Sequence, residues 1–492
     1  MTSDAVPFVE SDAPPPPGAL TRLRRGAGDW LRDATLWPLA VPYLLLRSLS
    51  MIGATPMILP DSATWRQEPS LPPYTFVSLT GEAMRGWVVP LFFAVLPSDM
   101  WRMVAQFVVS LVAWLVLATV VSRTLTVPVL RWASFVAILV LSCTAAVASW
   151  DRAILADSLS ISLTALTFAS WVVFVQRPTR GASIAVIAMT TLWLFTKPTL
   201  FAEAAIAAVV LLVFAALYRR HRLTYAVVGV VLVLGAAWGG VSGAASDTAF
   251  ARYPAYRSFG QNGLSQFGQN FMSALRLEIL GDPQARAWFI AEGMPNPTGL
   301  TPYTRRNPTD DDFQGQIAFT NRLQQRRDLV TWIEGDGRSV WFRYVLTHFP
   351  EKVLQFGIDL PWMLVPPRDS FVYVTQYRSV LPDSIESLVF DTGANRFQLS
   401  STYGDIGLWG GAIIALAIVG RFRGANRPVL IVAVGAGLIA VLGIGASWIA
   451  SPVELGRHAL PNSVLVRIAL QVVAFGLANA WMTRSERRPD TY

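Results

Sequence analysis

The chain has 492 residues, of which 53% are hydrophobic and only 15% are charged, and its mean hydropathy is +0.43. A soluble protein carries about 25% charged residues, so this composition excludes an ordinary soluble domain and indicates an integral membrane protein. The net charge of +8 resides mostly in short basic clusters between apolar runs, which suits anionic lipid headgroups and shows no pattern typical of nucleic-acid binding.

The N-terminal region is polar. Residues 1–28 hold a Pro-rich stretch followed by Arg22, Arg24 and Arg25, which is atypical of a cleavable signal peptide. We expect a disordered cytoplasmic tail here. Cys143 is the only cysteine, so no intrachain disulfide can form. The three histidines are far apart in sequence, which disfavours a structural zinc site.

Apolar runs of the length needed to cross a bilayer recur along the chain. They predict about ten spans, at 34–59, 100–122, 130–149, 154–175, 182–196, 199–218, 223–243, 404–420, 428–450 and 459–482. The predicted fold class is an α-helical polytopic membrane protein, with an N-terminal transmembrane module (29–243), a large extracytoplasmic loop region (244–403), a C-terminal module (404–483) and a cytoplasmic tail (484–492).

Basic clusters set the expected orientation. Six of them fall at alternate ends of the ten predicted spans, and the positive-inside rule places all six in the cytoplasm. They are Arg22–Arg32, Arg123/Arg131, Arg177/Arg180, Arg219–Arg222, Arg421/Arg423/Arg427 and Arg484/Arg487/Arg488. We therefore expect a multi-pass protein of the cell membrane with both termini cytoplasmic. Residues 85–97 are apolar, short and interrupted by Pro90, which predicts an interfacial helix. The loop region contains helical pieces, such as Phe319 to Trp332, and an apolar piece at 353–366.

Charged residues gather at the extracytoplasmic rim of this predicted topology. They are Asp61, Arg85, Asp151, Arg152, Asp157, Lys197 and Arg457. A carboxylate can accept the proton of an attacking hydroxyl, and cations can stabilise charge on a leaving phosphate. The ordinary alternative for Asp61 is a solvated loop carboxylate that caps a turn. Arg47 and Arg467 lie inside predicted spans, where they either snorkel or are satisfied locally, or else face inward to a lipid phosphate or a partner such as Glu203.

Several short motifs occur in a particular order. They are Asp61-Ser62 with Trp65, Arg85 before PLFFAVLP, Asp157-Ser158-Leu159, Thr196-Lys197-Pro198 and Arg457-His458-Ala459-Leu460-Pro461. In this order and placement the chain resembles the GT-C glycosyltransferases, in particular the branch with protein O-mannosyltransferases, aminoarabinose transferases and actinobacterial arabinofuranosyl- and mannosyltransferases. His458 departs from the usual tyrosine and Asp157 from the frequent glutamate.

The resemblance implies a GT-C-like bundle and transfer of a sugar, with inversion at C1, from a polyprenyl-phosphate-linked donor to an envelope glycan, lipid or protein hydroxyl. Asp61 would be the general base, and Arg85, Lys197, Arg457 and His458 would bind the donor phosphate. Asp157, Asp151 and Arg152 would bind acceptor, donor or a divalent cation (Mg²⁺ or Mn²⁺), although we favour a metal-free site. The alternatives are a transporter or polymerase, and a non-catalytic envelope-assembly scaffold.

Overall fold

The computed structural model describes residues 36–59, 61–66, 85–197, 200–217, 219–252, 264–304, 312–364, 382, 427–450 and 455–485. Within these ranges the regular structure is helical, and the only β-type pairing is an isolated parallel bridge between Met57 and Ala153. The span predicted at 404–420 and the tail predicted at 1–28 lie outside the described residues. The tail predicted at 484–492 begins inside α23, which continues to Ser485, and its remaining residues also lie outside the described ranges.

Five helices are long and apolar enough to cross a membrane. They are α6 (Asp99–Arg123), α9 (Asp157–Gln176), α12 (Arg222–Arg252), α22 (Arg427–Ala450) and α23 (Leu455–Ser485). At 1.5 Å per residue, helices of 20 residues or more cover the roughly 30 Å hydrocarbon core. The prediction of a helical membrane protein is thus confirmed.

The other predicted spans within the described residues form shorter or interrupted helices: α2 (Trp37–Leu49), α7 (Pro128–Ser142), α10 (Arg180–Leu194) and α11 (Leu200–Leu217). The run at 34–59 was expected to be one span, yet α2 ends at Leu49, and Gly53 turns the chain with a φ of +74°. Helix α7 is followed, across a bend, by α8 (Ala145–Ala148) and a 3-10 turn, η1 (Ser149–Arg152). A count of about ten spans stays a prediction.

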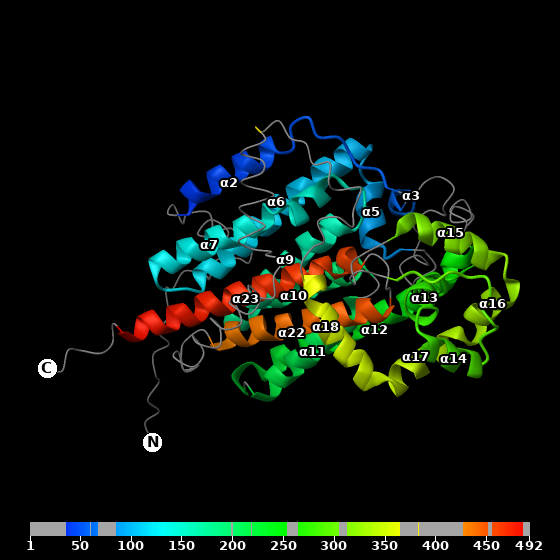
Figure 1. The fold of residues 1–492 in the computed structure, drawn as a ribbon. Helices are drawn as coiled ribbons and strands as arrows, with labels where there is room; N and C mark the ends of the chain where they lie inside the picture. Colours follow the sequence, from blue (N-terminus) through cyan, green and yellow to red (C-terminus); the bar gives the residue numbers. More distant parts are fainter. Residues whose placement is uncertain are drawn as a thin grey trace, which may run out of the picture.

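Helix α9 forms the centre of the bundle. It packs against α6, α10, α22 and α23 (Figure 1). Nearly all of its side chains are buried, which matches a sequence that is apolar or small all round rather than amphipathic. Its first residue, Asp157, therefore starts a rigid central element.

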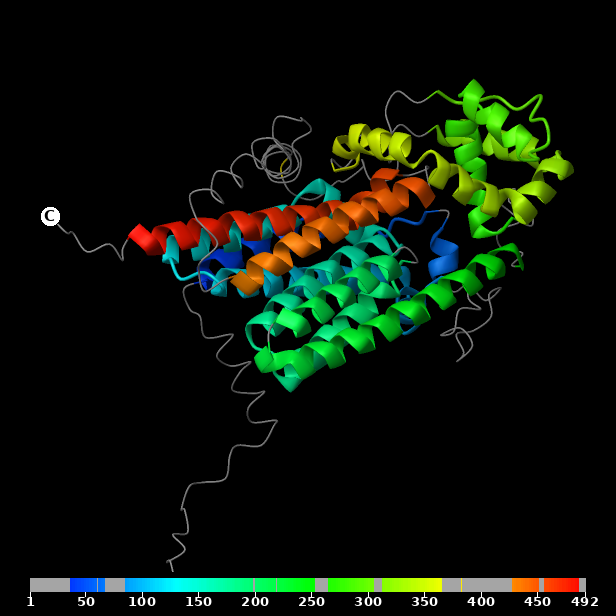
Figure 2. The same cartoon turned by 90° about the horizontal axis from the view of Figure 1, so that it is seen from below.

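The two ends of the bundle differ in charge and in attached structure. The α6–α7, α9–α10 and α11–α12 connections, the start of α22 and the end of α23 lie together at one end (Figures 1 and 2). This end carries the basic clusters that the described residues contain, and we call it the basic end. The starts of α9 and α23 lie at the opposite end.

At the basic end, Asn479 Oδ1 accepts hydrogen bonds from the backbone N–H groups of Thr126 (2.8 Å) and Val127 (3.0 Å), which joins the α6–α7 turn to α23.

A separate helical layer, the outer helical unit, lies beyond the end opposite the basic end (Figure 2). It consists of α13 (Gln266–Ala274), η4 (Leu275–Ile279), α14 (Pro283–Ala291), α15 (Phe313–Gln324), α16 (Arg327–Trp332), η5 (Ile333–Gly337) and α17 (Arg338–Thr347). It has its own hydrophobic core, built around Phe271, Phe289 and Trp341. α18 (Phe349–Leu364) leads from this unit back to α22 and α23. The predicted boundary at residue 244 falls inside α12, which continues to Arg252.

Candidate functional site

Asp61 precedes a one-turn helix, α3 (Ser62–Arg66), at the end of the bundle that faces the outer helical unit. Its backbone carbonyl accepts hydrogen bonds from Thr64 Oγ1 (2.8 Å) and Thr64 N (3.1 Å), and Ser62 Oγ accepts one from Leu59 N (2.8 Å). The Asp-Ser pair thus builds a fixed turn. The side chain of Asp61 remains 33% exposed, so a soluble group can still reach it.

Arg85 lies against this turn, just before α5 (Val88–Ala94). Its guanidinium stacks over the ring of Trp65 at 4.7 Å, its Nε donates to Thr64 Oγ1 (3.1 Å), and its Nη2 lies 3.6 Å from Asp61 Oδ1. Helix α5 is shorter than the interfacial helix predicted at 85–97, and its depth in a membrane stays a prediction. The cation is thus positioned by an aromatic face as well as by a carboxylate.

Arg457, near the start of α23, bridges the two predicted carboxylates. Its Nη2 lies 3.1 Å from Asp61 Oδ2 and its Nε lies 3.5 Å from Asp157 Oδ2. Lys197, which follows α10, donates to Asp157 Oδ1 at 2.7 Å. Asp157 is buried at the first position of α9, where the positive helix terminus also favours a carboxylate. We call Asp61, Arg85, Asp157, Lys197 and Arg457 the rim cluster.

The rim cluster carries three cations and two carboxylates, an excess of one positive charge. Burial alone would raise the pKa of Asp61, but the guanidinium groups of Arg85 and Arg457 outweigh it and hold that pKa below its usual value of 3.8. Asp61 is therefore ionised at neutral pH. His458, the next residue in α23, lies within electrostatic range of both carboxylates. An anion that entered this site would meet a positive surplus.

Asp151 and Arg152 lie beside the rim cluster in a second polar group. Asp151 is buried in an ion pair with Arg47 of α2, and its Oδ1 accepts a hydrogen bond from Ser158 Oγ (2.6 Å). Arg152 donates to the carbonyl of Thr55 (3.4 Å), next to the Met57–Ala153 bridge. These contacts tie the segment after α2 to the start of α9. The predicted role of Asp151 and Arg152 toward acceptor, donor or metal stays a prediction.

A third buried polar contact joins Glu203, which was expected as a partner of a buried arginine, to Asn462, which the sequence did not single out. Glu203 of α11 accepts a hydrogen bond from Asn462 Nδ2 of α23 at 2.9 Å, and both side chains are buried. A methyl group on Gly443 of α22 would overlap both side chains, so the glycine keeps this space clear. We call Glu203 and Asn462 the acid–amide pair. Asn462 lies one helical turn beyond His458 and therefore on the same face of α23. That spacing could have indicated Asn462 as a residue near the site.

The two arginines expected inside spans, Arg47 and Arg467, both have polar partners. Arg47 pairs with Asp151, and Glu203 pairs with Asn462, so Glu203 is not the partner of Arg47. Arg467 Nη1 donates within its own helix, to Ser463 Oγ (2.9 Å) and the Ser463 carbonyl (3.0 Å). This contact within α23 is one of the alternatives expected for Arg467, and an inward contact to a lipid phosphate stays a prediction.

The rim cluster is a poor fit for a divalent cation. The guanidinium of Arg457 stands between Asp61 and Asp157, in the position that a shared metal ion would need. Among the described residues, no group of three or more His, Cys, Asp and Glu side chains could hold a metal ion.

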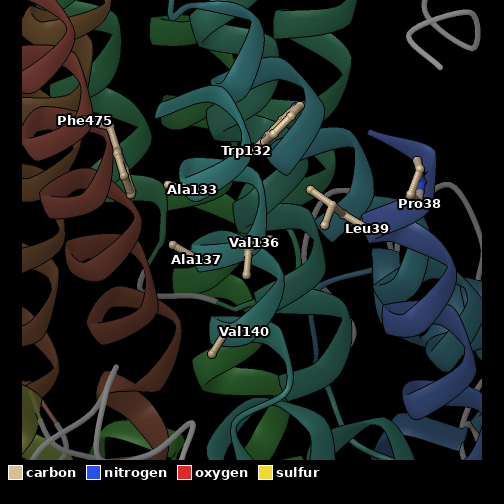
Figure 3. Close-up of a pocket in the computed structure, with 8 residues that line it drawn as sticks. All are labelled: Pro38, Leu39, Trp132, Ala133, Val136, Ala137, Val140 and Phe475. Carbon is tan, nitrogen blue, oxygen red and sulfur yellow. The ribbon is translucent and has the colours of Figure 1, made fainter. Parts of the chain in front are cut away.

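An apolar groove among the described residues lies far from this chemistry. It has a volume of about 630 Å³ and lies among α2, α7 and α23 toward the basic end, lined by apolar side chains such as Leu39, Trp132, Val136 and Phe475 (Figure 3). Such a lining suits hydrocarbon and offers nothing to a sugar or a phosphate.

Comparison of the chain with protein-family models, curated proteins and solved structures found no match.

Proposed function

We propose that the chain is a membrane glycosyltransferase, which moves a sugar from a polyprenyl-phosphate-linked donor to an acceptor hydroxyl at the rim cluster. The observation that carries the proposal is the Arg457 bridge between a partly exposed and a buried carboxylate, flanked by Arg85 and Lys197. A proton acceptor and several phosphate-binding cations thus share one site at the end of an apolar bundle, where the donor's tail can stay in lipid.

In the proposed reaction the acceptor oxygen attacks C1 of the donor sugar from the face opposite the phosphate. The new C1–O bond forms as the bond from C1 to the phosphate oxygen breaks, and the phosphate leaves with the electron pair. The acceptor proton passes to Asp61. Arg85, Arg457 and Lys197 bind the leaving phosphate and stabilise its charge.

The low pKa of Asp61 has a consequence for this order of events. A carboxylate held by two guanidinium groups is a weak base. Arrival of the donor phosphate would draw Arg85 and Arg457 toward itself and release Asp61 from part of that field. Donor binding would then raise the basicity of Asp61 just before the proton must move.

The test uses the purified full chain in liposomes with a panel of polyprenyl-phosphate-linked hexoses and pentoses. The expected result is donor-dependent release of polyprenyl phosphate by the wild type, with turnover lost in Asp61→Asn. Release at equal rates by both proteins would contradict the proposed role of Asp61. If the wild type released polyprenyl phosphate from none of the donors, the proposed glycosyltransferase activity would be contradicted.

The second candidate is a transporter of a lipid-linked sugar, and it is favoured by the buried ionisable groups inside the bundle. Glu203 and Arg467, both buried within helices, are the observations in question, because ionisable groups away from the rim are typical of transport pathways. A transporter would move the intact donor across liposomes with the sugar–phosphate bond unbroken. For the glycosyltransferase we also propose that both termini lie in the cytoplasm and that the outer helical unit lies outside it.

A further inference from the structure

The apolar face of α18 is a surface that neither the bundle nor the outer helical unit covers within the described residues. We propose that α18 lies in the membrane leaflet nearer the outer helical unit, as a partly inserted helix whose free face contacts lipid. The proposal concerns the depth of one helix and does not rest on the activity proposed above.

The inner face of α18 belongs to the transmembrane bundle. Met363 and Leu364 are buried in the main hydrophobic core, and Phe356 and Leu360 pack against it. Ser463 Oγ donates to the carbonyl of Leu364 at 3.0 Å. The last turns of α18 are therefore part of the bundle rather than of the outer helical unit.

These contacts occur at membrane depth. Ser463 is eight residues into α23, which is about 12 Å along a helix axis. On the neighbouring helix, the Phe356 ring packs over Gly445, five residues before the end of α22 at Ala450, or about 8 Å along its axis. Since α22 has 24 residues, or about 36 Å, it exceeds a 30 Å hydrocarbon core by only a few ångström at each end. With α22 centred on the hydrocarbon core, Gly445 falls within that core, and Ser463, which lies further from its own helix end, is expected there too.

The side of α22 that α18 covers faces outward from the bundle. Val434, Leu438 and Leu442 are exposed along one stripe of α22, and Gly445 continues that stripe one turn further. Because the ring of Phe356 lies over Gly445, α18 crosses the outward-facing side of α22 and not an internal seam. Figure 2 shows α18 lying across the ends of α22 and α23 on the outside of the bundle.

The free face of α18 has the chemistry of a lipid-facing surface. Leu354, Ile358 and Trp362 follow each other at i, i+4 and i+8 and are 68%, 54% and 45% exposed. They form one apolar stripe along the helix. At the start of α18, Lys352 pairs with Glu278 of the outer helical unit (2.8 Å) and lies over the Trp448 ring (5.5 Å). A charged first turn and an apolar remainder are what a helix that descends from the interface requires.

Asp359 is an ionisable side chain in the apolar part of α18, so a position in lipid requires that its carboxylate be satisfied. Its Oδ2 accepts a hydrogen bond from Trp448 Nε1 (3.1 Å) and its Oδ1 accepts one from Gln355 Nε2 (2.9 Å). The bond to Trp448 joins the half-buried carboxylate of Asp359 to α22, whereas its partner Gln355 is exposed. The position of Asp359 is compatible with that leaflet because both of its oxygens are hydrogen-bonded.

The experiment places a spin label at Leu354→Cys, Ile358→Cys or Trp362→Cys in a Cys143→Ala background, with the full chain in nanodiscs. Accessibility to molecular oxygen, which partitions into lipid, is compared with accessibility to a water-soluble nickel chelate. The controls are Leu438→Cys on α22, which is 62% exposed, and Ser339→Cys, exposed on the outer helical unit.

We expect all three α18 labels to favour oxygen over nickel, as at Leu438, with the preference increasing from Leu354 to Trp362. A preference for nickel, as at Ser339, would show that α18 stays in water and would overturn the proposal. Protection from both reagents would show that another part of the chain or a second copy covers the stripe, and would overturn it equally. The labelled positions are exposed, so labelling them leaves the core unchanged, and the buried Cys143→Ala change is common to all variants and controls.

Discussion

Replacement of Asp61 by asparagine is the most direct test of the rim cluster. The change keeps the size of the side chain and removes its ability to accept a proton. If Asp61 is the general base, turnover falls on the order of 10²–10⁴-fold, which corresponds to about 3–5 kcal/mol in activation free energy. Folding should be much less affected, because Asp61 is one-third exposed and its two ion pairs are partly screened. Pairs of that kind contribute roughly 0.2–1 kcal/mol each.

The arginines around Asp61 keep other partners in this variant. Arg85 retains the Trp65 ring and Thr64, and Arg457 retains Asp157. No buried cation is left uncompensated, so the free energy of unfolding should change by about 2 kcal/mol at most. A loss of turnover in this variant can therefore be distinguished from a loss of folding.

Asp99 offers a matched control. It is 24% exposed and pairs with Arg66 at 2.9 Å and Arg102 at 2.6 Å, so it has the same kind of surroundings outside the rim cluster. The assay follows release of polyprenyl phosphate by purified protein in liposomes, together with the thermal midpoint of each variant. A turnover of Asp61→Asn equal to that of Asp99→Asn would refute the assignment, and a dead Asp157→Asn beside it would transfer the role of base to Asp157.

Further outcomes can be checked with other single-residue variants. Arg85→Ala should weaken donor use by about 2–5 kcal/mol, measured as kcat/KM for the donor, if the pair is desolvated; an unchanged value would place the phosphate at Arg457 instead. The same variant removes an attraction that lowers the pKa of Asp61. Ionised Asp61 is lost as pH falls through its folded-state pKa, so the acid limb of the pH–rate profile should move to higher pH in Arg85→Ala, and a fixed limb would assign it to another group. Gly443→Ala should destabilise the protein by roughly 1–3 kcal/mol through overlap with the acid–amide pair, whereas Gly435→Ala on the same helix meets nothing within 4 Å; equal thermal midpoints would contradict the packing argument. A cysteine at Ser339 should react with an impermeant reagent in intact cells, and reaction only after permeabilisation would invert the proposed topology.

The acid–amide pair illustrates how the site depends on packing between distant segments. Glu203 follows Lys197 in the chain by six residues, and Asn462 follows Arg457 by five. A hydrogen bond between α11 and α23 in an apolar surrounding resists separation of the two segments that carry these cations. The pair thus supports the geometry of the rim cluster without a contact to substrate.

Hydropathy and charge along the sequence were sufficient to identify a helical membrane protein. The long apolar runs at 100–122, 154–175, 223–243, 428–450 and 459–482 all became candidate spans, because a backbone in lipid must satisfy its own hydrogen bonds within a helix. Shorter runs were less well predicted. The run at 34–59 gave only the 13-residue α2, since local turn geometry at Gly53 does not appear in a hydropathy average.

The rim cluster was predictable as a set of charged residues at one end, but its pairing was decided by tertiary structure. Spacing in sequence placed Asp61, Arg85, Asp157, Lys197 and Arg457 at the same end. It could not show that Arg457, 396 residues from Asp61 in the chain, bridges the two carboxylates, or that Asp151 pairs with Arg47 instead. Hydropathy and charge patterns record which side chains prefer water or lipid, and they are local. Which ionised groups meet is set by how helices rotate and cross in a close-packed bundle, and only the folded chain fixes that.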